Sequence, residues 1–236
     1  HMRGYLCDIS NIKKICKNRK VFLIEDCSQC LGGSYNQKPI GSFGDMSIFS
    51  FQFNKLITAG EGGLIATNNK KLFEEINEFH DLGMGRVLND PDPIGNVHKK
   101  FGLNYHASDL IGAFLLGQLE SLEKILFKLR ENRNDLLKFF EKNENKAFDI
   151  IYDRKNSNPN NAFLLLKIKT GVSTNKISEY FKSIKLNIQF NKSYDGHNFN
   201  SWMKFLKKNK IKYKNKAGKY SNDILNKSFF IEISSI

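Results

Sequence analysis

The fold of this chain is restricted most strongly by the stretch from Met46 to Gly63. It opens with small, β-branched and aromatic residues and ends in a polar loop that contains Gly60, Gly62 and Gly63. Such an apolar run predicts a buried strand, and the loop after it is where an α/β sheet presents functional groups to a ligand. Lys55 in this loop is therefore a candidate reactive group, and an ordinary solvated lysine is the alternative.

A second apolar run, Val21 to Ile24, stops at Glu25 and Asp26. A continuous apolar run predicts a strand that is covered on both faces. Asp26 then lies at the carboxyl end of a parallel strand, the edge at which open α/β sheets bind ligands. A carboxylate that caps the next helix is the alternative.

The remaining patterns predict an α/β domain followed by a smaller α+β domain. Ser108 is expected to cap a long helix that runs to about Phe140 and holds the boundary, so we assign residues 1–115 to the first domain and 116–236 to the second. We also expect helices over 5–20, 69–79 and 174–184, strands over 64–67, 162–168, 186–190 and 229–233, and a long loop over 81–100.

The composition, 40% hydrophobic and 26% charged residues, is ordinary for a globular protein. We expect a cytoplasmic protein without a membrane partner, because there is neither an apolar run of about 18 residues nor the apolar core of a signal peptide. The four cysteines all lie within the first 30 residues, unlike a secreted disulfide framework.

Cys27 and Cys30 form a C-x-x-C pattern, so a redox pair or a zinc site must be considered. A tetrahedral zinc site needs two further ligands, and the other two cysteines do not form a second pair with this spacing. We therefore expect small buried thiols and no metal site.

The formal net charge of +13 includes eight lysines and no acidic residue between Lys204 and Lys219. A nucleic-acid patch is one interpretation of such a run. It contains no arginine and no recognisable binding motif, and lysine is abundant throughout the chain, so a compositional bias is the simpler explanation. We expect no nucleic-acid partner.

Three blocks of sequence resemble one known family. Ser50, Lys55, Thr58 and the Gly-Glu-Gly-Gly run at 60–63 are similar to the lysine segment of the DegT-like sugar aminotransferases, which are fold type I enzymes that use pyridoxal 5'-phosphate (PLP). Asp26 and Gln29 match the Asp-x-x-Gln element of that family, and residues 102–105 match its Gly-x-Asn-Tyr element. The resemblance implies part of a large α/β domain with a mixed, mostly parallel sheet.

The resemblance also implies a role for five residues. Lys55 is expected to form the Schiff base with PLP, Asp26 to pair with the ring nitrogen, and Gln29 to hydrogen-bond the phenolic oxygen. Ser50 is expected to hold the phosphate, and Asn104 to bind the phosphate of a neighbouring subunit, which implies a homodimer. No metal is implied.

The implied reaction transfers an amino group from glutamate or glutamine to a keto sugar, which we expect to be linked to a nucleotide and used for polysaccharides or antibiotics. A PLP-dependent sugar dehydratase and an inactive remnant that serves as an interaction partner are the alternatives. Lys55 argues against those dehydratases that have histidine at this position.

Two departures from the family pattern qualify these expectations. His106 stands where the family usually has arginine, which affects any substrate contact there. The start of the chain is similar to an internal His-x-x-Gly segment of the family, and the end stops before the family's last helix. We therefore expect a fragment, which alone binds PLP poorly and is inactive.

Overall fold

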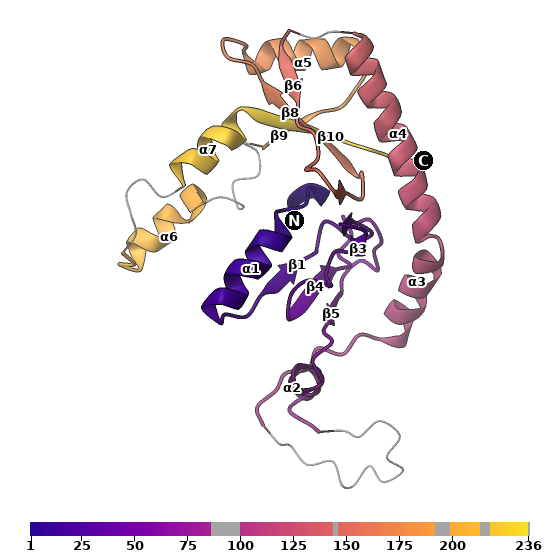
Figure 1. Cartoon of the computed structure of the whole chain (residues 1–236), viewed down its shortest axis with the longest axis vertical. Coiled ribbons are helices and arrows are strands. Elements are labelled where there is room, and N and C mark those ends of the chain that lie inside the picture. The colour runs from indigo at the N-terminus through magenta and orange to yellow at the C-terminus, as the bar shows by residue number, and fades with distance from the viewer. Residues whose placement is uncertain (86–99, 144–145, 192–198, 213–217, 236) are drawn as a thin grey trace. The chain divides into compact units, whose positions relative to one another are not determined.

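The computed structural model describes residues 1–85, 100–143, 146–191, 199–212 and 218–235. The chain divides into two compact units (Figure 1). Unit 1 contains His1–Leu126 and Asp153–Asn160, and unit 2 contains Phe127–Tyr152 and Asn161–Ile236. The expected division at residue 115 falls in the same helical stretch, but the units divide after Leu126. A short segment beyond that helix, Asp153–Asn160, belongs to unit 1, which local sequence patterns do not reveal.

Unit 1 is an α/β unit around a mixed three-stranded sheet in the order β1-β4-β5. Strand β1 is parallel to β4, and β4 is antiparallel to β5, so the sheet is mixed as expected. A second small sheet has the order β3-β2-β7 and joins two segments far apart in the sequence. The elements of unit 1 are the 3₁₀ helix η1 (Met2–Gly4), α1 (Ile9–Arg19), β1 (Ile24–Asp26), β2 (Ser34–Tyr35), β3 (Lys38–Pro39), β4 (Met46–Ser50), β5 (Gly63–Ala66), α2 (Lys70–His80), α3 (Asp109–Glu120), the start of α4 (Leu122–Lys142) and β7 (Ser157–Asn158).

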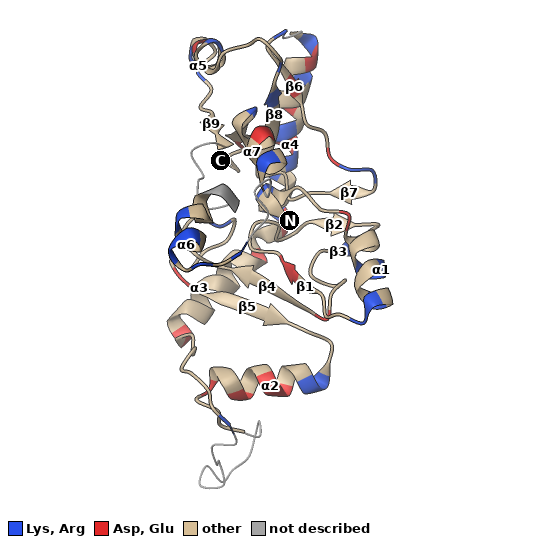
Figure 2. Cartoon of the chain, turned by 90° about the vertical axis from the view of Figure 1, so that its left-hand side faces the viewer, with Lys and Arg blue, Asp and Glu red and all other residues tan. Residues whose placement is uncertain are grey.

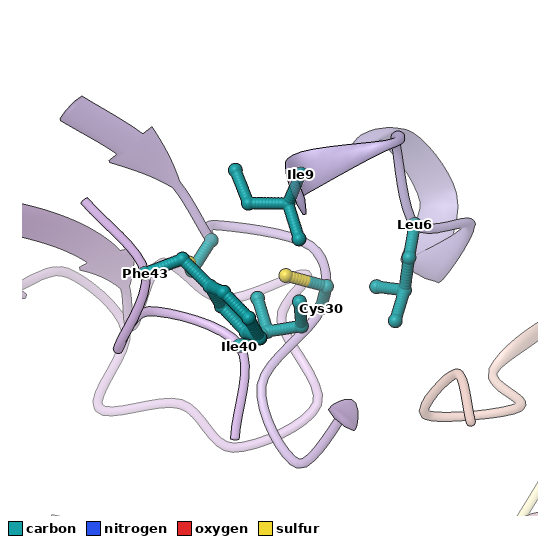
Figure 3. Close-up of a cluster of buried hydrophobic side chains, with 6 residues drawn as sticks. Leu6, Ile9, Cys30, Ile40 and Phe43 are labelled. Carbon is teal, nitrogen blue, oxygen red and sulfur yellow. The ribbon is translucent and has the colours of Figure 1, made fainter. Parts of the chain in front are cut away.

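The main core of unit 1 lies between the start of α1 and the segments that follow β1 and β3. Figure 3 shows its side chains, which come from three separate stretches of the chain, 6–9, 27–30 and 40–43. Its buried members are Leu6, Ile9, Cys27, Cys30, Ile40 and Phe43. Burial of this apolar surface fixes the segment after β1 against α1.

The expected strand over 21–24 is wrong in its position and in its burial. Strand β1 begins at Ile24, and Val21, Phe22 and Ile24 are 53%, 75% and 55% exposed. Within the described residues β1 is an edge strand, paired with β4 only, and no described element buries these three side chains.

The helices differ from expectation in two further ways. The long helix divides at Ser121 into α3 and α4, although Ser108 does cap α3 by accepting a hydrogen bond from the backbone N–H of Ile111. Helix α2 begins and ends within one residue of its expected limits, but Phe73 and Phe79 on its apolar side are 51% and 41% exposed. Of the loop expected over 81–100, residues 86–99 lie outside the described part.

Unit 2 is an α+β unit built on an antiparallel sheet in the order β6-β8-β10-β9. Aromatic rings fill its core: Phe181 lies 5.8, 5.3 and 5.3 Å from the rings of Phe140, Phe148 and Phe229. The elements are most of α4, β6 (Phe148–Ile150), β8 (Phe163–Ile168), α5 (Thr174–Ser183), β9 (Gln189–Phe190), η5 (Phe199–Trp202), α6 (Met203–Lys208), α7 (Lys219–Asn226) and β10 (Ser228–Glu232).

Basic side chains gather on α6, as the blue ribbon in Figure 2 shows. Lys204, Lys207 and Lys208 of this helix are all exposed. No helix in the described part of the chain combines the length and apolarity that a membrane crossing requires.

Candidate active site

The candidate site lies where the parallel strands β1 and β4 end (Figure 1). Asp26 is the last residue of β1 and is in register with Ile48 of β4, two positions before Ser50 at the end of that strand. The Cys27 backbone N–H extends the pairing by donating to the Ile48 carbonyl at 2.9 Å. Because the carboxyl ends of parallel strands meet at one sheet edge, Asp26 and Ser50 lie at the same edge.

Asp26 is an exposed carboxylate that is held in its anionic form. Its Oδ1 accepts a hydrogen bond from the Ser28 backbone N–H at 3.0 Å. Burial alone raises the pKa of Asp26, but the hydroxyl and backbone N–H of Ser28, together with the charges of the His1 amino group and of Lys55, hold the pKa below its ordinary value. The effect of Lys55 means that its amine lies within electrostatic range of Asp26.

Lys55 lies half-buried in a loop whose base is closed by backbone hydrogen bonds. The Phe51 N–H donates to the Gly62 carbonyl at 2.9 Å, and the Ala59 N–H donates to the Phe51 carbonyl at 3.0 Å. Among the residues that the structure describes, Lys55 makes no ion pair, so its amine is available to a ligand.

Thr58 stabilises the end of the loop that carries Lys55, which we call the lysine loop. Its hydroxyl donates to the Phe51 carbonyl at 3.0 Å and accepts from the Gly60 N–H at 3.0 Å. The side-chain amide of Gln118 on α3 makes two hydrogen bonds to the Thr58 backbone. Its Oε1 accepts from the Thr58 N–H at 3.0 Å, and its Nε2 donates to the Thr58 carbonyl. Gly60 and Gly62 have φ values of +82° and +136°, a region that residues with a Cβ rarely adopt.

Gln29 lies in the turns that follow β1. Its Oε1 accepts a hydrogen bond from the Arg3 backbone N–H at 2.6 Å, and its carbonyl accepts from Asn160 Nδ2 at 3.1 Å. Since the amide oxygen is occupied, the Nε2 donors of Gln29 are the groups left for a ligand.

Asn104 is exposed and lies in a different part of unit 1, beside the end of α2. Its Oδ1 accepts a hydrogen bond from the His106 backbone N–H at 3.2 Å. Within the described residues no hydrogen bond links Asn104 or Gln29 to Asp26, Lys55 or Ser50. Asp26 and Ser50 thus lie at one sheet edge, with Lys55 in the loop that continues from Ser50 and Gln29 three residues beyond Asp26, whereas Asn104 lies beside Asp81.

Two supporting residues were not identified from the sequence. Glu25, only 2% exposed, accepts hydrogen bonds from the backbone N–H groups of Gly41, Phe43 and Gly44 at 3.0, 2.6 and 2.6 Å. It orders the loop before β4, whereas Asp26 points to the opposite side of the strand. The position of Glu25 at the end of an apolar run was a signal in the sequence that could have identified it. For Gln118 the sequence showed only its helical spacing.

The cysteines are all free thiols, and Cys27 and Cys30 are fully buried. A hydrogen bond to Cys27 and burial raise the pKa of Cys30, so this thiol stays protonated. In the described residues one cluster has metal-ligand side chains, His1, Glu25 and Cys27, whose ligand atoms lie within 4.8 Å of one another. Its polar atoms are already engaged: Glu25 accepts the three loop N–H groups, and His1 Nδ1 accepts the Cys7 N–H at 3.2 Å.

Residues 1–233 match the DegT/DnrJ/EryC1/StrS aminotransferase family, and Asp26, Ser50 and Lys55 fall within this match. The chain belongs to this family. A relative, the GDP-perosamine synthase of Escherichia coli O157:H7, is 33% identical over 160 residues. That alignment covers 66% of this chain and 40% of the relative.

Two solved structures share the fold of this chain. An aminotransferase from Psychrobacter cryohalolentis superposes with a TM-score of 0.83 at 20% identity, covering 100% of this chain and 62% of that one. The E. coli GDP-4-keto-6-deoxy-D-mannose-3-dehydratase with bound hydrated PLP gives a TM-score of 0.77 at 21% identity, covering 99% and 61%. The chain therefore spans about three fifths of these solved relatives.

Proposed function

We propose that this chain carries the PLP-binding centre of a sugar aminotransferase, which moves an amino group from glutamate or glutamine to a nucleotide-linked keto sugar. The observation that carries the proposal is the position of Asp26 and Ser50 at the carboxyl edge of the β1–β4 pair, with Lys55 in the loop that continues from Ser50. Membership of the aminotransferase family and the nucleotide sugar in the name of a relative support the choice of reaction and substrate.

The residues at this edge fit PLP by their chemistry. Asp26, with its lowered pKa, is an anion suited to a protonated ring nitrogen, and the Ser50 hydroxyl suits a phosphate oxygen. The Nε2 donors of Gln29 suit the phenolic oxygen, because Arg3 already occupies Oε1. When bound, PLP supplies an electron-accepting ring that stabilises charge released at the Cα of an amino acid.

The chain's own groups then divide the work. Lys55 Nζ would hold the cofactor and, once the amino donor has displaced it, would serve as the general base for the Cα proton of that donor. Asp26 would hold the proton on the ring nitrogen. Thr58 and Gln118 keep the lysine loop in position through their hydrogen bonds.

We also propose a cytoplasmic homodimer in which Asn104 binds the phosphate in the neighbouring subunit. The free state of all four cysteines fits a reducing compartment. Helix α3 supports a second copy, since it is strongly apolar and yet Leu110, Phe114 and Leu116 are 79%, 60% and 60% exposed. Exposed apolar surface of this kind is typical of protein interfaces.

The cofactor assignment is tested by titrating the protein that contains this chain with PLP and recording the visible absorption, because the chain alone is expected to bind PLP poorly. We expect a band from lysine-bound cofactor that is absent in Lys55→Ala and retained in Lys71→Ala, which removes an exposed lysine of α2. A spectrum of free PLP for the unaltered protein would overturn the assignment.

The reaction is tested by following isotopically labelled amino nitrogen from glutamate in the protein that contains this chain. We expect the label in the sugar product. Loss of a sugar hydroxyl with release of labelled ammonia would instead establish the dehydratase.

A further inference from the structure

The segment from Gly102 to His106 is fastened to the end of α2 by its backbone. The Leu103 N–H donates to the Phe79 carbonyl at 2.8 Å, and the Tyr105 N–H donates to the His80 carbonyl at 3.0 Å. The two backbones are in close contact, because a Cβ added to Gly102 would lie 2.1 Å from the Gly83 nitrogen. Asn104 is therefore carried by a segment with little freedom to move.

A side-chain pair reinforces this arrangement. Asp81, at the C-cap of α2, is 5% exposed, and its Oδ1 lies 2.7 Å from His106 Nε2. A carboxylate can only accept, so the imidazole carries its proton on Nε2. The His106 backbone N–H in turn donates to Asn104 Oδ1 at 3.2 Å. His106 thus links the buried carboxylate of Asp81 to the exposed side-chain amide of Asn104.

These two hydrogen bonds determine which end of the Asn104 side-chain amide is available to a ligand. Its oxygen is occupied by the His106 N–H, and among the described residues none accepts a hydrogen bond from Nδ2. The two N–H donors of Nδ2 therefore face outward. Donors, and not acceptors, are what an anionic oxygen requires.

We infer that Asp81 and His106 are positioning residues, which hold Asn104 so that its Nδ2 donors meet an anionic phosphate oxygen. The inference rests on the proposed function, and it names residues that act through Asn104 and do not touch the ligand. A local cap of α2 with no effect on ligand binding is the competing explanation.

The surroundings of the pair contain several other titratable groups. The His80 ring lies 4.9 Å from the His106 ring, and its Nδ1 lies 2.9 Å from the Asn77 carbonyl. Lys100 pairs with Glu78 at 2.7 Å, one turn earlier on α2. Substitution at Asp81 or His106 leaves the Lys100–Glu78 pair intact, so Glu78→Gln is a matched control for loss of one acid at this end of the helix.

The test measures the PLP affinity of the protein that contains this chain, together with the NMR signal of the Asn104 side-chain amide. We expect PLP to shift that signal, and Asn104→Ala to weaken PLP binding about tenfold, the effect of one hydrogen bond to a charged group. Asp81→Asn and His106→Ala should each weaken binding about fivefold, with no further loss in the Asn104→Ala background. His106→Arg, whose guanidinium also donates to a carboxylate, should restore affinity, and Glu78→Gln should leave it unchanged.

Folding of the variants is checked by hydrogen exchange at the Leu103 and Tyr105 amides, which stays slow where the segment remains fastened to α2. Unaltered PLP affinity in Asp81→Asn and His106→Ala, or a loss that adds fully to that of Asn104→Ala, would overturn the inference. Unaltered affinity in Asn104→Ala would overturn it together with the role of Asn104. Neither result affects the assignment of Lys55, whereas absence of the lysine-bound band would reject the proposed function itself.

Discussion

Two neighbouring carboxylates at the end of β1 have opposite environments. Glu25 is buried and accepts three backbone N–H groups, so its charge is satisfied by the loop at 41–44. Asp26 is exposed at the sheet edge and influenced by Lys55. Alternation along a strand separates the two side chains, which leaves one acid for structure and the other for a ligand.

The lowered pKa of Asp26 makes a prediction about stability and pH. An acid with a folded pKa below its unfolded value, about 3.9, stabilises the fold above that value, and the stabilisation disappears as the pH falls through the folded pKa. We expect Asp26→Asn to be less stable than the unaltered chain at neutral pH, and the difference to shrink below about pH 5.

The measurement is the urea midpoint of both proteins at several pH values. Asp135→Asn, on the exposed side of α4, controls for the loss of one charge. A difference in urea midpoint between Asp26→Asn and the unaltered chain that grew as the pH fell would contradict a lowered pKa of Asp26.

At the scale of single elements, two glycines provide a matched pair of substitutions. Gly83 has a φ of +80°, and a Cβ there would lie 1.7 Å from the Lys100 carbonyl oxygen. Gly117 lies on α3, and a Cβ there would meet nothing within 4 Å. We expect Gly83→Ala to destabilise unit 1 by about 2–4 kcal/mol and Gly117→Ala to stabilise it by about 0.5–1 kcal/mol.

Chemical denaturation of both variants and of the unaltered chain measures whether each substitution lowers or raises the free energy of unfolding. Equal stability of the two variants would mean that the segment at 100–106 is not packed against the end of α2.

The elements predicted correctly were those with a strong local signal. Ser108 caps α3, and the apolar run from Met46 forms β4, because both patterns act within a few residues. The burial expected for Val21 to Ile24 was wrong, since it depends on which elements cover a face. The pairing of β2 with β7 joins residues more than 100 positions apart and left no local pattern.

The candidate site divides in the same way. The sequence predicted that Asp26 lies at the end of a strand and that Lys55 lies in the loop that follows the strand with Ser50. The Gln118 contact to Thr58 and the Asp81–His106 pair could not be predicted, because each joins separate elements through a single side chain.

At the scale of the whole molecule, the chain consists of two units with separate cores. The core of unit 1 is aliphatic and contains Cys27 and Cys30, whereas that of unit 2 is aromatic and centred on Phe181. The single tryptophan, Trp202, belongs to unit 2. Tryptophan fluorescence and thiol exposure therefore report on different units.

We expect Phe181→Ala to lower the denaturant midpoint seen by fluorescence, because truncation of a fully buried phenylalanine costs about 3–5 kcal/mol. The midpoint for exposure of the Cys27 and Cys30 thiols should remain unchanged. Phe127→Ala, at a 59% exposed position of the same unit, should have little effect on either probe. Equal shifts of both transitions in Phe181→Ala would show that the two units unfold as one.

The account depends most on Lys55 as the amine that receives the cofactor. Borohydride reduction of the protein that contains this chain with excess PLP, followed by peptide mapping, identifies every lysine that reacts. We predict that Lys55 is labelled well above the other lysines and that Asp26→Ala reduces this labelling, because the carboxylate no longer holds the ring nitrogen. Labelling spread evenly over exposed lysines, or concentrated at another position, would contradict the account.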